Sequence, residues 1–186
     1  MDSISQAVKV LKEGGLILYP TDTVWGIGCD ATNEKAVAKV YALKHREDSK
    51  ALVLLAADLD MVARYIKEIP QMAIQLVEVN DAPMTIVYPG AMGLAHNVVA
   101  EDGSVGIRIP LQGFCTELLK RFPRPIVSTS ANISGEPTAQ NYCDISEEII
   151  NAVDYVCWTR RQEHKPHKPS SIIRLGLGGE VEIIRK

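Results

Sequence analysis

Short apolar runs alternate with amphipathic segments along the 186-residue chain, and this order limits the fold more than any other feature. Apolar residues that recur every three or four positions predict helices, whereas short continuous apolar runs predict strands covered on both faces. Strands that alternate with helices indicate an α/β domain. The last strands are not separated by long crossovers, so part of the sheet is expected to be antiparallel.

The first expected helix is marked at both ends. Ser3 and Gln6 have the spacing of a capping box, and the pair Gly14-Gly15 ends the apolar stripe. Pro20 is expected to end the first strand, because proline cannot donate to a ladder. Further helices are expected at 33–44, on both sides of Pro70, at 112–122 and at 146–152. Strands are expected at 16–19, 51–56, 84–89, 104–110, 125–132, 154–158, 171–175 and 180–185.

The length is typical of one domain, taken here as residues 1–186. At this size about 70% of the unfolded surface can be buried, so the core needs neither disulfides nor a metal. The apolar fraction of 46% and the charged fraction of 23% are those of an average soluble protein. A net charge of −3 excludes a surface built throughout for nucleic acid, but is compatible with a local basic patch.

The four cysteines predict a reducing compartment. Cys29, Cys115, Cys143 and Cys157 show neither CxxC spacing nor zinc-type pairing with histidine, so buried free thiols are expected. The N-terminal segment has no basic region followed by an apolar core, as a signal peptide would. No apolar run approaches the roughly 20 residues needed to span a bilayer. The chain is therefore predicted to be cytoplasmic, with no membrane partner.

Four segments deliver polar side chains where strands or a helix end. They are residues 20–23, 44–50, 104–108 and 128–132. In open α/β sheets, ligands bind in the crevice outside strand ends. Taken singly, each segment is also explained by turn chemistry, because serine, threonine, aspartate and asparagine satisfy loop backbone groups. Together, the four segments favour a shared binding site.

The pair Lys44 and Arg46 follows a predicted helix. Cations are favoured at a helix C-terminus by the dipole, so a solvated helix end is one interpretation. The other is an anion clamp, in which arginine offers a planar fork and lysine a mobile charge. Residues two apart on a helix diverge by about 200°, so a clamp requires the chain to leave the helix near Lys44. The turn formers Asp48 and Ser49 favour that exit.

The segment "STSANISG" carries a row of hydroxyls and an amide. In an extended strand Ser128 and Ser130 point to the same side. This pattern indicates either a turn ended by Gly135 or a shelf for phosphate or ribose oxygens. There is no Walker sequence and no GxGxxG, so any nucleotide site is of another kind.

Two further features are less specific. Trp25 follows the first polar turn and is interpreted as a core residue or as part of a pocket wall. The basic segment 159–170 contains His164 and His167, but nothing near them has metal-ligand spacing. No metal site is therefore assigned to the protein. Because this loop directly precedes Ser170, it is interpreted as a lid over the site.

The segments "YPTDTVWGIG", "ALKHRE", "SVGIRIP", "STSANISGEPT" and "PSSIIRL…VEIIRK" together resemble the threonylcarbamoyl-AMP synthase family, the YrdC-like proteins. The match runs from about residue 3 to the end of the chain and is to the short, single-domain form. The resemblance implies a twisted, mixed parallel and antiparallel sheet with helices, around a large concave cavity lined by positive charge.

The family's activity implies a nucleotidyltransferase. L-threonine, bicarbonate and ATP would give L-threonylcarbamoyl-AMP and pyrophosphate, with Mg²⁺ carried by the ATP. The product would supply a downstream tRNA threonylcarbamoyl transferase complex for modification of adenosine at tRNA position 37. Direct binding of tRNA or double-stranded RNA is left open.

The resemblance assigns three groups of residues. The implied catalytic group is Lys44, Arg46, Ser130 and Asn132. The implied ATP-binding group is Arg46, Lys50, Ser104, Ser130, Thr138 and Arg185. The implied threonine-binding group is Thr23, Arg108, Ser128 and Ser171. Of these, Arg108 is expected to pair with the substrate carboxylate through a bidentate fork.

The chain departs from the family's usual residues at Trp25, His45, Glu47, Lys50, Leu55 and 82–84. The family usually has glycine at the position of His45 and histidine at that of Leu55. These departures leave selectivity for threonine open. Two alternatives therefore remain: a carbamoyl-adenylate-forming enzyme with another acceptor or carbamoyl source, and a non-catalytic RNA-binding module.

Overall fold

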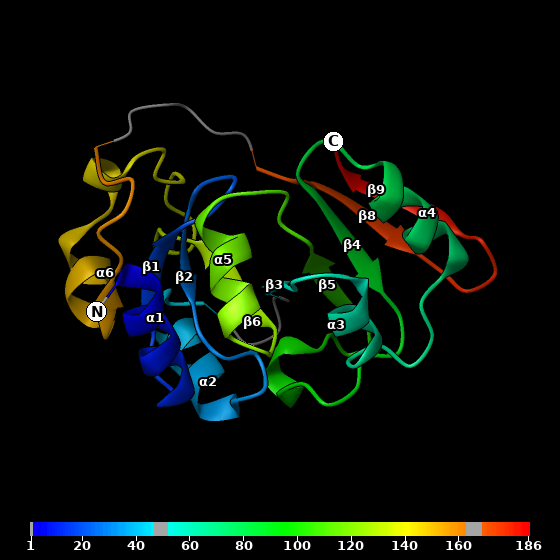
Figure 1. Cartoon of the computed structure of the whole chain (residues 1–186), viewed down its shortest axis with the longest axis horizontal. Helices are drawn as coiled ribbons and strands as arrows, with labels where there is room; N and C mark the ends of the chain where they lie inside the picture. Colours follow the sequence, from blue (N-terminus) through cyan, green and yellow to red (C-terminus); the bar gives the residue numbers. More distant parts are fainter. Residues whose placement is uncertain (1, 47–51, 163–168) are drawn as a thin grey trace.

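The computed structural model describes residues 2–46, 52–162 and 169–186. These residues form one nine-stranded sheet with the order β7-β1-β2-β6-β3-β5-β4-β8-β9 (Figure 1). The strands are β1 (Ile17–Pro20), β2 (Trp25–Gly28), β3 (Val53–Leu55), β4 (Met84–Tyr88), β5 (Val105–Arg108), β6 (Ile126–Ser130), β7 (Tyr155–Val156), β8 (Ser171–Leu175) and β9 (Val181–Arg185). The helices are α1 (Ser3–Lys12), α2 (Glu34–Leu43), α3 (Leu59–Ala63), α4 (Gln71–Val79), α5 (Phe114–Arg121) and α6 (Glu147–Ala152), with 3₁₀ turns η1 (His96–Val98) and η2 (Tyr142–Asp144).

Parallel and antiparallel pairs are mixed in the sheet. The pairs β1–β7, β3–β5 and β4–β8 are parallel, and the other five neighbouring pairs are antiparallel. The predicted fold class, an α/β domain with a mixed sheet, is therefore confirmed. The two sides of the sheet lie at opposite ends of the molecule: β1, the neighbour of the end strand β7, lies near α1 and α6, and the other end strand, β9, lies near α4 (Figure 1).

The first helix has a different cap from the one expected. The side chain of Asp2, not Ser3, accepts a hydrogen bond from the Ser5 backbone N–H at 2.7 Å. Ser3 is instead the first helical residue, and its hydroxyl bonds to Tyr155 at 3.0 Å. Both residue types cap helices well, so the pattern located the helix but not its first residue.

Strand β2 was not expected, because its residues were interpreted as part of a polar turn. Strand β1 ends at Pro20, as expected, but Pro20 is itself paired, opposite Trp25. Gly28 has a packing role, since a Cβ there would lie 2.7 Å from the Tyr19 ring and 2.9 Å from the Val127 carbonyl oxygen. The glycine therefore lets β2 pass close to a buried ring and to β6.

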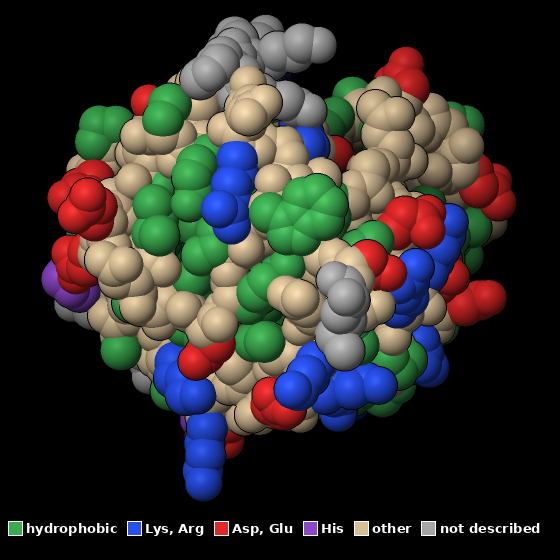
Figure 2. Space-filling view, turned by 60° about the vertical axis from the view of Figure 1, so that its left-hand side comes forward, with side chains coloured by type: hydrophobic (Ala, Val, Ile, Leu, Met, Phe, Trp, Pro, Cys, Tyr) green, Lys and Arg blue, Asp and Glu red, His purple; other side chains and the backbone are tan. Residues whose placement is uncertain are grey.

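Three of the four cysteines are buried free thiols, as expected, but Cys143 is exposed. Among the described residues, no helix has both the length and the apolar character required to cross a membrane. Figure 2 shows acidic and basic side chains interspersed over the face it presents, rather than gathered into one basic field.

Candidate functional site

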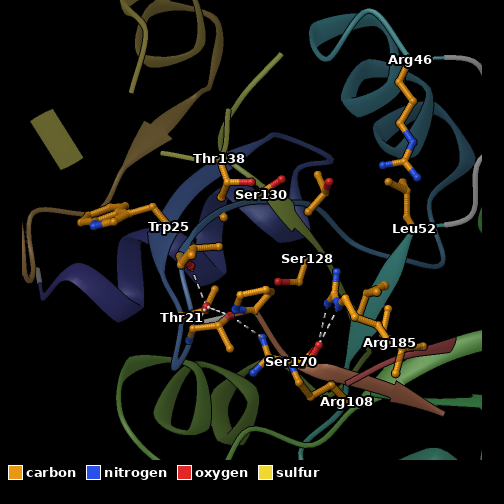
Figure 3. Close-up of a pocket in the computed structure, with 17 residues that line it drawn as sticks. Thr21, Trp25, Arg46, Leu52, Arg108, Ser128, Ser130, Thr138, Ser170 and Arg185 are labelled. Carbon is orange, nitrogen blue, oxygen red and sulfur yellow. Dashed lines mark hydrogen bonds between the residues drawn. The ribbon is translucent and has the colours of Figure 1, made fainter. Parts of the chain in front are cut away.

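A cavity of about 290 Å³ lies where side chains of β2, β3, β5, β6, β8 and β9 come together (Figure 3). All four polar segments singled out in the sequence contribute to its wall. Three arginines line it, namely Arg46, Arg108 and Arg185, and none of the described lining residues is an aspartate or glutamate. Hydroxyl groups make up most of the remaining polar wall. Such a cavity attracts anions.

The turn between β1 and β2 is held by its own hydroxyls. Thr21 Oγ1 donates to the Val24 carbonyl oxygen at 2.6 Å and lies 2.9 Å from Thr23 Oγ1. It also accepts the Thr23 backbone N–H at 3.0 Å. Because the single hydroxyl hydrogen of Thr21 goes to Val24, the Thr23 hydroxyl is the donor in the pair between them. Thr21 and Thr23 are both buried and both line the cavity.

Arg108, at the end of β5, reaches this turn. Its Nη1 donates to Asp22 Oδ1, and its Nη2 lies 3.4 Å from Thr23 Oγ1. Asp22 was not predicted as a site residue, although it stands inside the quoted motif "YPTDTVWGIG". A turn-forming aspartate is common after a strand, so the sequence held no signal that this one meets an arginine 86 positions away.

Lys44 lies behind the cavity wall. Its Nζ donates to the carbonyl oxygens of Ser130 and Asn132, both at 2.5 Å, and it is 2% exposed. Helix α2 ends at Leu43, and His45 has φ +50°, so the chain leaves the helix where a clamp required it to. Burial, followed by the charge of Arg46, lowers the pKa of Lys44 to about 8. Lys44 is not among the residues that line the cavity, whereas Arg46 is.

The residues of the "STSAN" segment likewise fall into two groups, those that line the cavity and those that do not. Ser128, Ser130 and, further along, Thr138 line the cavity. Asn132 is not among the lining residues, and its amide donates to the carbonyl oxygens of Ile133 at 3.0 Å and Glu136 at 2.9 Å. Lys44 and Asn132 thus shape the turn that carries Ser130, instead of facing the hollow themselves.

Two of the described residues assigned to ligand binding, Ser104 and Ser171, are not among the residues that line the cavity. Ser104 precedes β5, whose opposite end carries Arg108, and its hydroxyl donates to Asp102 at 2.6 Å. Ser171 is preceded and followed by wall residues, Ser170 and Ile172, so the alternation of an extended chain directs it to the other face. Lys50 lies outside the described residues.

Ser170 is a wall residue that the sequence reasoning missed by one position. Its hydroxyl bonds to the buried Thr85 hydroxyl at 2.8 Å. Its carbonyl oxygen accepts a hydrogen bond from Arg185 Nε at 2.9 Å. Arg185, from β9, therefore enters the cavity anchored on Ser170, as Figure 3 shows. Burial lowers the pKa of the Arg46 and Arg185 guanidinium groups below their usual value.

The remaining features have mixed outcomes. Trp25 is both buried, at 6% exposure, and part of the cavity wall, with its ring 5.2 Å from that of Tyr142. The centre of the segment interpreted as a lid, residues 163–168 with both histidines, lies outside the described residues. On one side of this gap Arg160 donates to the Thr21 carbonyl oxygen at 2.9 Å, and on the other Pro169 lines the cavity.

Comparison with known families identifies the family of this chain. The family model named Sua5_yciO_yrdC, described as telomere recombination, matches residues 9–186. The chain belongs to the Sua5/YciO/YrdC family. A relative in this family, the threonylcarbamoyl-AMP synthase of Coxiella burnetii strain RSA 493, is 34% identical over 180 residues, which cover 96% of this chain and 95% of the relative.

Solved structures of the Sua5/YciO/YrdC family share the fold. The crystal structure of P. abyssi Sua5 complexed with L-threonine has a TM-score of 0.82 and 26% identity, covering 92% of this chain and 50% of that one. The chain thus spans about half the length of that Sua5 protein. E. coli YciO has a TM-score of 0.83 and 23% identity, covering 98% of this chain and 88% of that chain.

Proposed function

We propose that this chain is an L-threonylcarbamoyladenylate synthase. It would convert L-threonine, bicarbonate and ATP into threonylcarbamoyl-AMP and pyrophosphate. The observation that carries the proposal is the convergence of Arg46, Arg108 and Arg185 with a set of hydroxyls in one cavity, in a chain whose relatives bear that name. The product would serve a tRNA threonylcarbamoyl transferase complex acting at position 37.

The chemistry needs the charges that the cavity supplies. The threonine amine first adds to the carbonyl carbon of bicarbonate, and loss of water gives a carbamate. A carbamate oxygen then attacks the α-phosphorus of ATP, and the bond to the leaving pyrophosphate breaks. Anionic carbamate must approach an anionic triphosphate, so fixed cations lower the barrier by offsetting repulsion and stabilising the charge that develops. Arg46 and Arg185 are proposed for this role on the phosphates, with Ser130 and Thr138 as hydroxyl donors.

The amino-acid end is proposed to lie at the β1–β2 turn. There Arg108 would bind the threonine carboxylate, with Thr23 and Ser128 beside it. Lys44 and Asn132 are proposed to act on the shape of the Ser130 turn, since Lys44 Nζ is bonded to the carbonyl oxygens of Ser130 and Asn132. Alignment of the two reactants would supply much of the rate enhancement.

Mg²⁺ is proposed to arrive with the nucleotide. Mg²⁺ keeps several waters and binds substrate phosphates, often with few protein ligands. The described part of the chain has no group of three or more histidine, cysteine, aspartate or glutamate side chains arranged to hold a metal. Phosphate oxygens and water are therefore the ligands that suit this site, where the ion would neutralise phosphate charge.

A pyrophosphate-release assay tests the function. The chain is incubated with ATP, Mg²⁺ and labelled bicarbonate, and each amino acid is added in turn. Threonine-dependent release with label in an adenylate product supports the proposal. Release with another acceptor would indicate the related carbamoyl-adenylate-forming enzyme, and tight RNA binding without release an RNA-binding module.

A further inference from the structure

Arg108, which lines the cavity, forms a buried ion pair with Asp22 that none of the assigned roles explains. The side chains of Arg108 and Asp22 are 4% and 7% exposed. The second carboxylate oxygen of Asp22 faces the Leu111 backbone N–H at 3.3 Å. Asp22 therefore contacts β5 and the segment after it, although it belongs to the β1–β2 turn.

The guanidinium is held at both terminal nitrogens. Nη1 of Arg108 is bonded to Asp22, and Nη2 approaches the Thr23 hydroxyl at 3.4 Å. The Thr23 oxygen is itself fixed, because its hydrogen points to Thr21. These contacts use one hydrogen on each terminal nitrogen, and a guanidinium carries five N–H groups in one plane. Once two contacts are set, the directions of the remaining N–H groups are set as well.

Stability alone is a weak reason for such a pair. Removing two charges from water costs several kcal/mol per ion, and well-packed apolar residues often serve stability equally well. A second aspartate–arginine pair shows the contrast. Asp30 is also buried, but its partner Arg124 is 40% exposed, and neither residue lines the cavity. Of these two pairs, Asp22–Arg108 is the one whose arginine is buried and also lines the cavity.

We propose that Asp22 is a positioning residue for substrate recognition: it holds Arg108 against the β1–β2 turn so that the remaining guanidinium N–H groups point at the carboxylate of the amino-acid substrate. This inference rests on the proposed function and deepens it. The Asp22 charge also balances that of Arg108. The pair is therefore suited to a single carboxylate and poorly suited to a phosphate, which separates the amino-acid end from the nucleotide end.

The test compares two probes, L-threonine and L-threoninamide, which differ in the carboxylate alone. Binding of each is measured by calorimetry for the wild-type chain and for Asp22→Asn, in which one oxygen acceptor remains but the charge is lost. We expect Asp22→Asn to weaken L-threonine binding about tenfold, the effect of a charge-assisted hydrogen bond, and to leave L-threoninamide binding nearly unchanged. The preference for the carboxylate should fall accordingly, with ATP binding within about twofold of wild type.

Asp30→Asn is the matched control, because it removes the same charge from another buried pair with arginine. It should lower the melting temperature without changing the ratio between the two probes. Asp22→Glu keeps the charge but displaces the guanidinium by one methylene. Asp22→Glu should also lose the preference for L-threonine over L-threoninamide. It is the variant to use if Asp22→Asn does not fold.

An unchanged probe ratio in both Asp22 variants would overturn the inference. The proposed function is judged separately, from pyrophosphate release by the wild-type chain. If the wild-type chain releases pyrophosphate but both Asp22 variants bind the two probes in the wild-type ratio, the inference is wrong and the proposed function stands. If the wild-type chain prefers L-threonine over its amide, the Asp22 variants lose this preference and no pyrophosphate is released, the inference stands and the proposed function is wrong. Equal binding of both probes to the wild-type chain contradicts the inference as well.

Discussion

The two ends of the cavity use arginine in different ways. At the β1–β2 turn, Arg108 is paired with a buried carboxylate and held by a chain of hydroxyls. Elsewhere in the wall, Arg185 is anchored on the neutral oxygens of Ser170, and burial lowers the pKa of both Arg185 and Arg46. At the first end the charge of Asp22 balances that of Arg108, which favours recognition of one small anion. Arg185 is held by neutral oxygens and keeps its positive charge, which suits a polyphosphate.

The strongest test of this contrast removes a cation from the proposed nucleotide end. Arg46→Ala should lower kcat/KM for pyrophosphate release by about 100-fold or more, the scale of losing an electrostatic stabiliser. Steady-state assays at saturating threonine measure it. Arg121→Ala, at a half-exposed arginine on α5, is the control and should stay within about twofold. Equal turnover by Arg46→Ala and wild type would contradict the assignment of Arg46.

A second test asks whether Lys44 supports the wall. Lys44→Met leaves the Ser130 and Asn132 carbonyl oxygens without their donor, and should lower the free energy of unfolding by about 2 kcal/mol. Denaturant titration measures the loss. A contact made only with substrate would leave the stability of the free protein unchanged, and that result would contradict the supporting role.

The same residue predicts a pH dependence. Burial lowers the folded-state pKa of Lys44 from 10.5 to about 8, so between these values the unfolded chain binds more protons. The free energy of unfolding contributed by Lys44 should therefore rise with pH over this window. A neutral amine keeps two hydrogens, enough for both carbonyl oxygens. Melting temperatures of wild type and Lys44→Met should diverge from pH 8 to 10; convergence would contradict the buried-lysine explanation.

A pair of serines tests the corrected wall. Ser130 lines the cavity, whereas Ser104 is bonded to Asp102 at the far end of β5. Ser130→Ala should raise the KM for ATP about tenfold, the upper range for one hydrogen bond to a charged group. Ser104→Ala should leave it within about twofold. A larger effect at Ser104 than at Ser130 would contradict the proposed placement of the nucleotide end.

The smallest expected effect concerns the turn between Lys44 and Arg46. His45 has φ +50°, a left-handed conformation that costs a residue with a Cβ about 1 kcal/mol. His45→Gly removes this strain, but it also removes an exposed contact between His45 Nε2 and Glu148 Oε1 at 3.1 Å. His45→Ala removes the same contact and keeps the strain. The free energy of unfolding, measured by thermal unfolding, should therefore be about 1 kcal/mol higher for the glycine variant than for the alanine variant. Equal values would show that the turn is unstrained.

The sequence predicted regular elements better than turns. Helix α2 and strand β4 match the apolar periodicity closely, because burial of one face sets that pattern. Strand β2 was missed because glycines and a preceding polar turn carry no apolar pattern. It is a strand because it pairs with its neighbour β1 and with β6, which is distant in the sequence.

The site shows the same limit. The resemblance, read position by position, chose Ser171 where the wall has Ser170, because the order of residues does not show which face of an extended segment is turned inwards. It grouped Lys44 with Arg46, yet the left-handed turn at His45 sends one behind the wall and the other into it. Neither outcome follows from residue type, since both depend on backbone direction over one or two residues.

By itself the sequence determined the family, the mixed α/β fold and the four segments that meet at the cavity. Apolar periodicity and the order of motifs are properties of the sequence, so they can be recognised without a structure. Only the tertiary structure decided which side chains face the hollow, and it alone revealed the pairing of Asp22 with Arg108. That pairing joins residues 86 positions apart. A buried charge acquires its role from the partner that the fold brings to it, and local sequence does not record that partner.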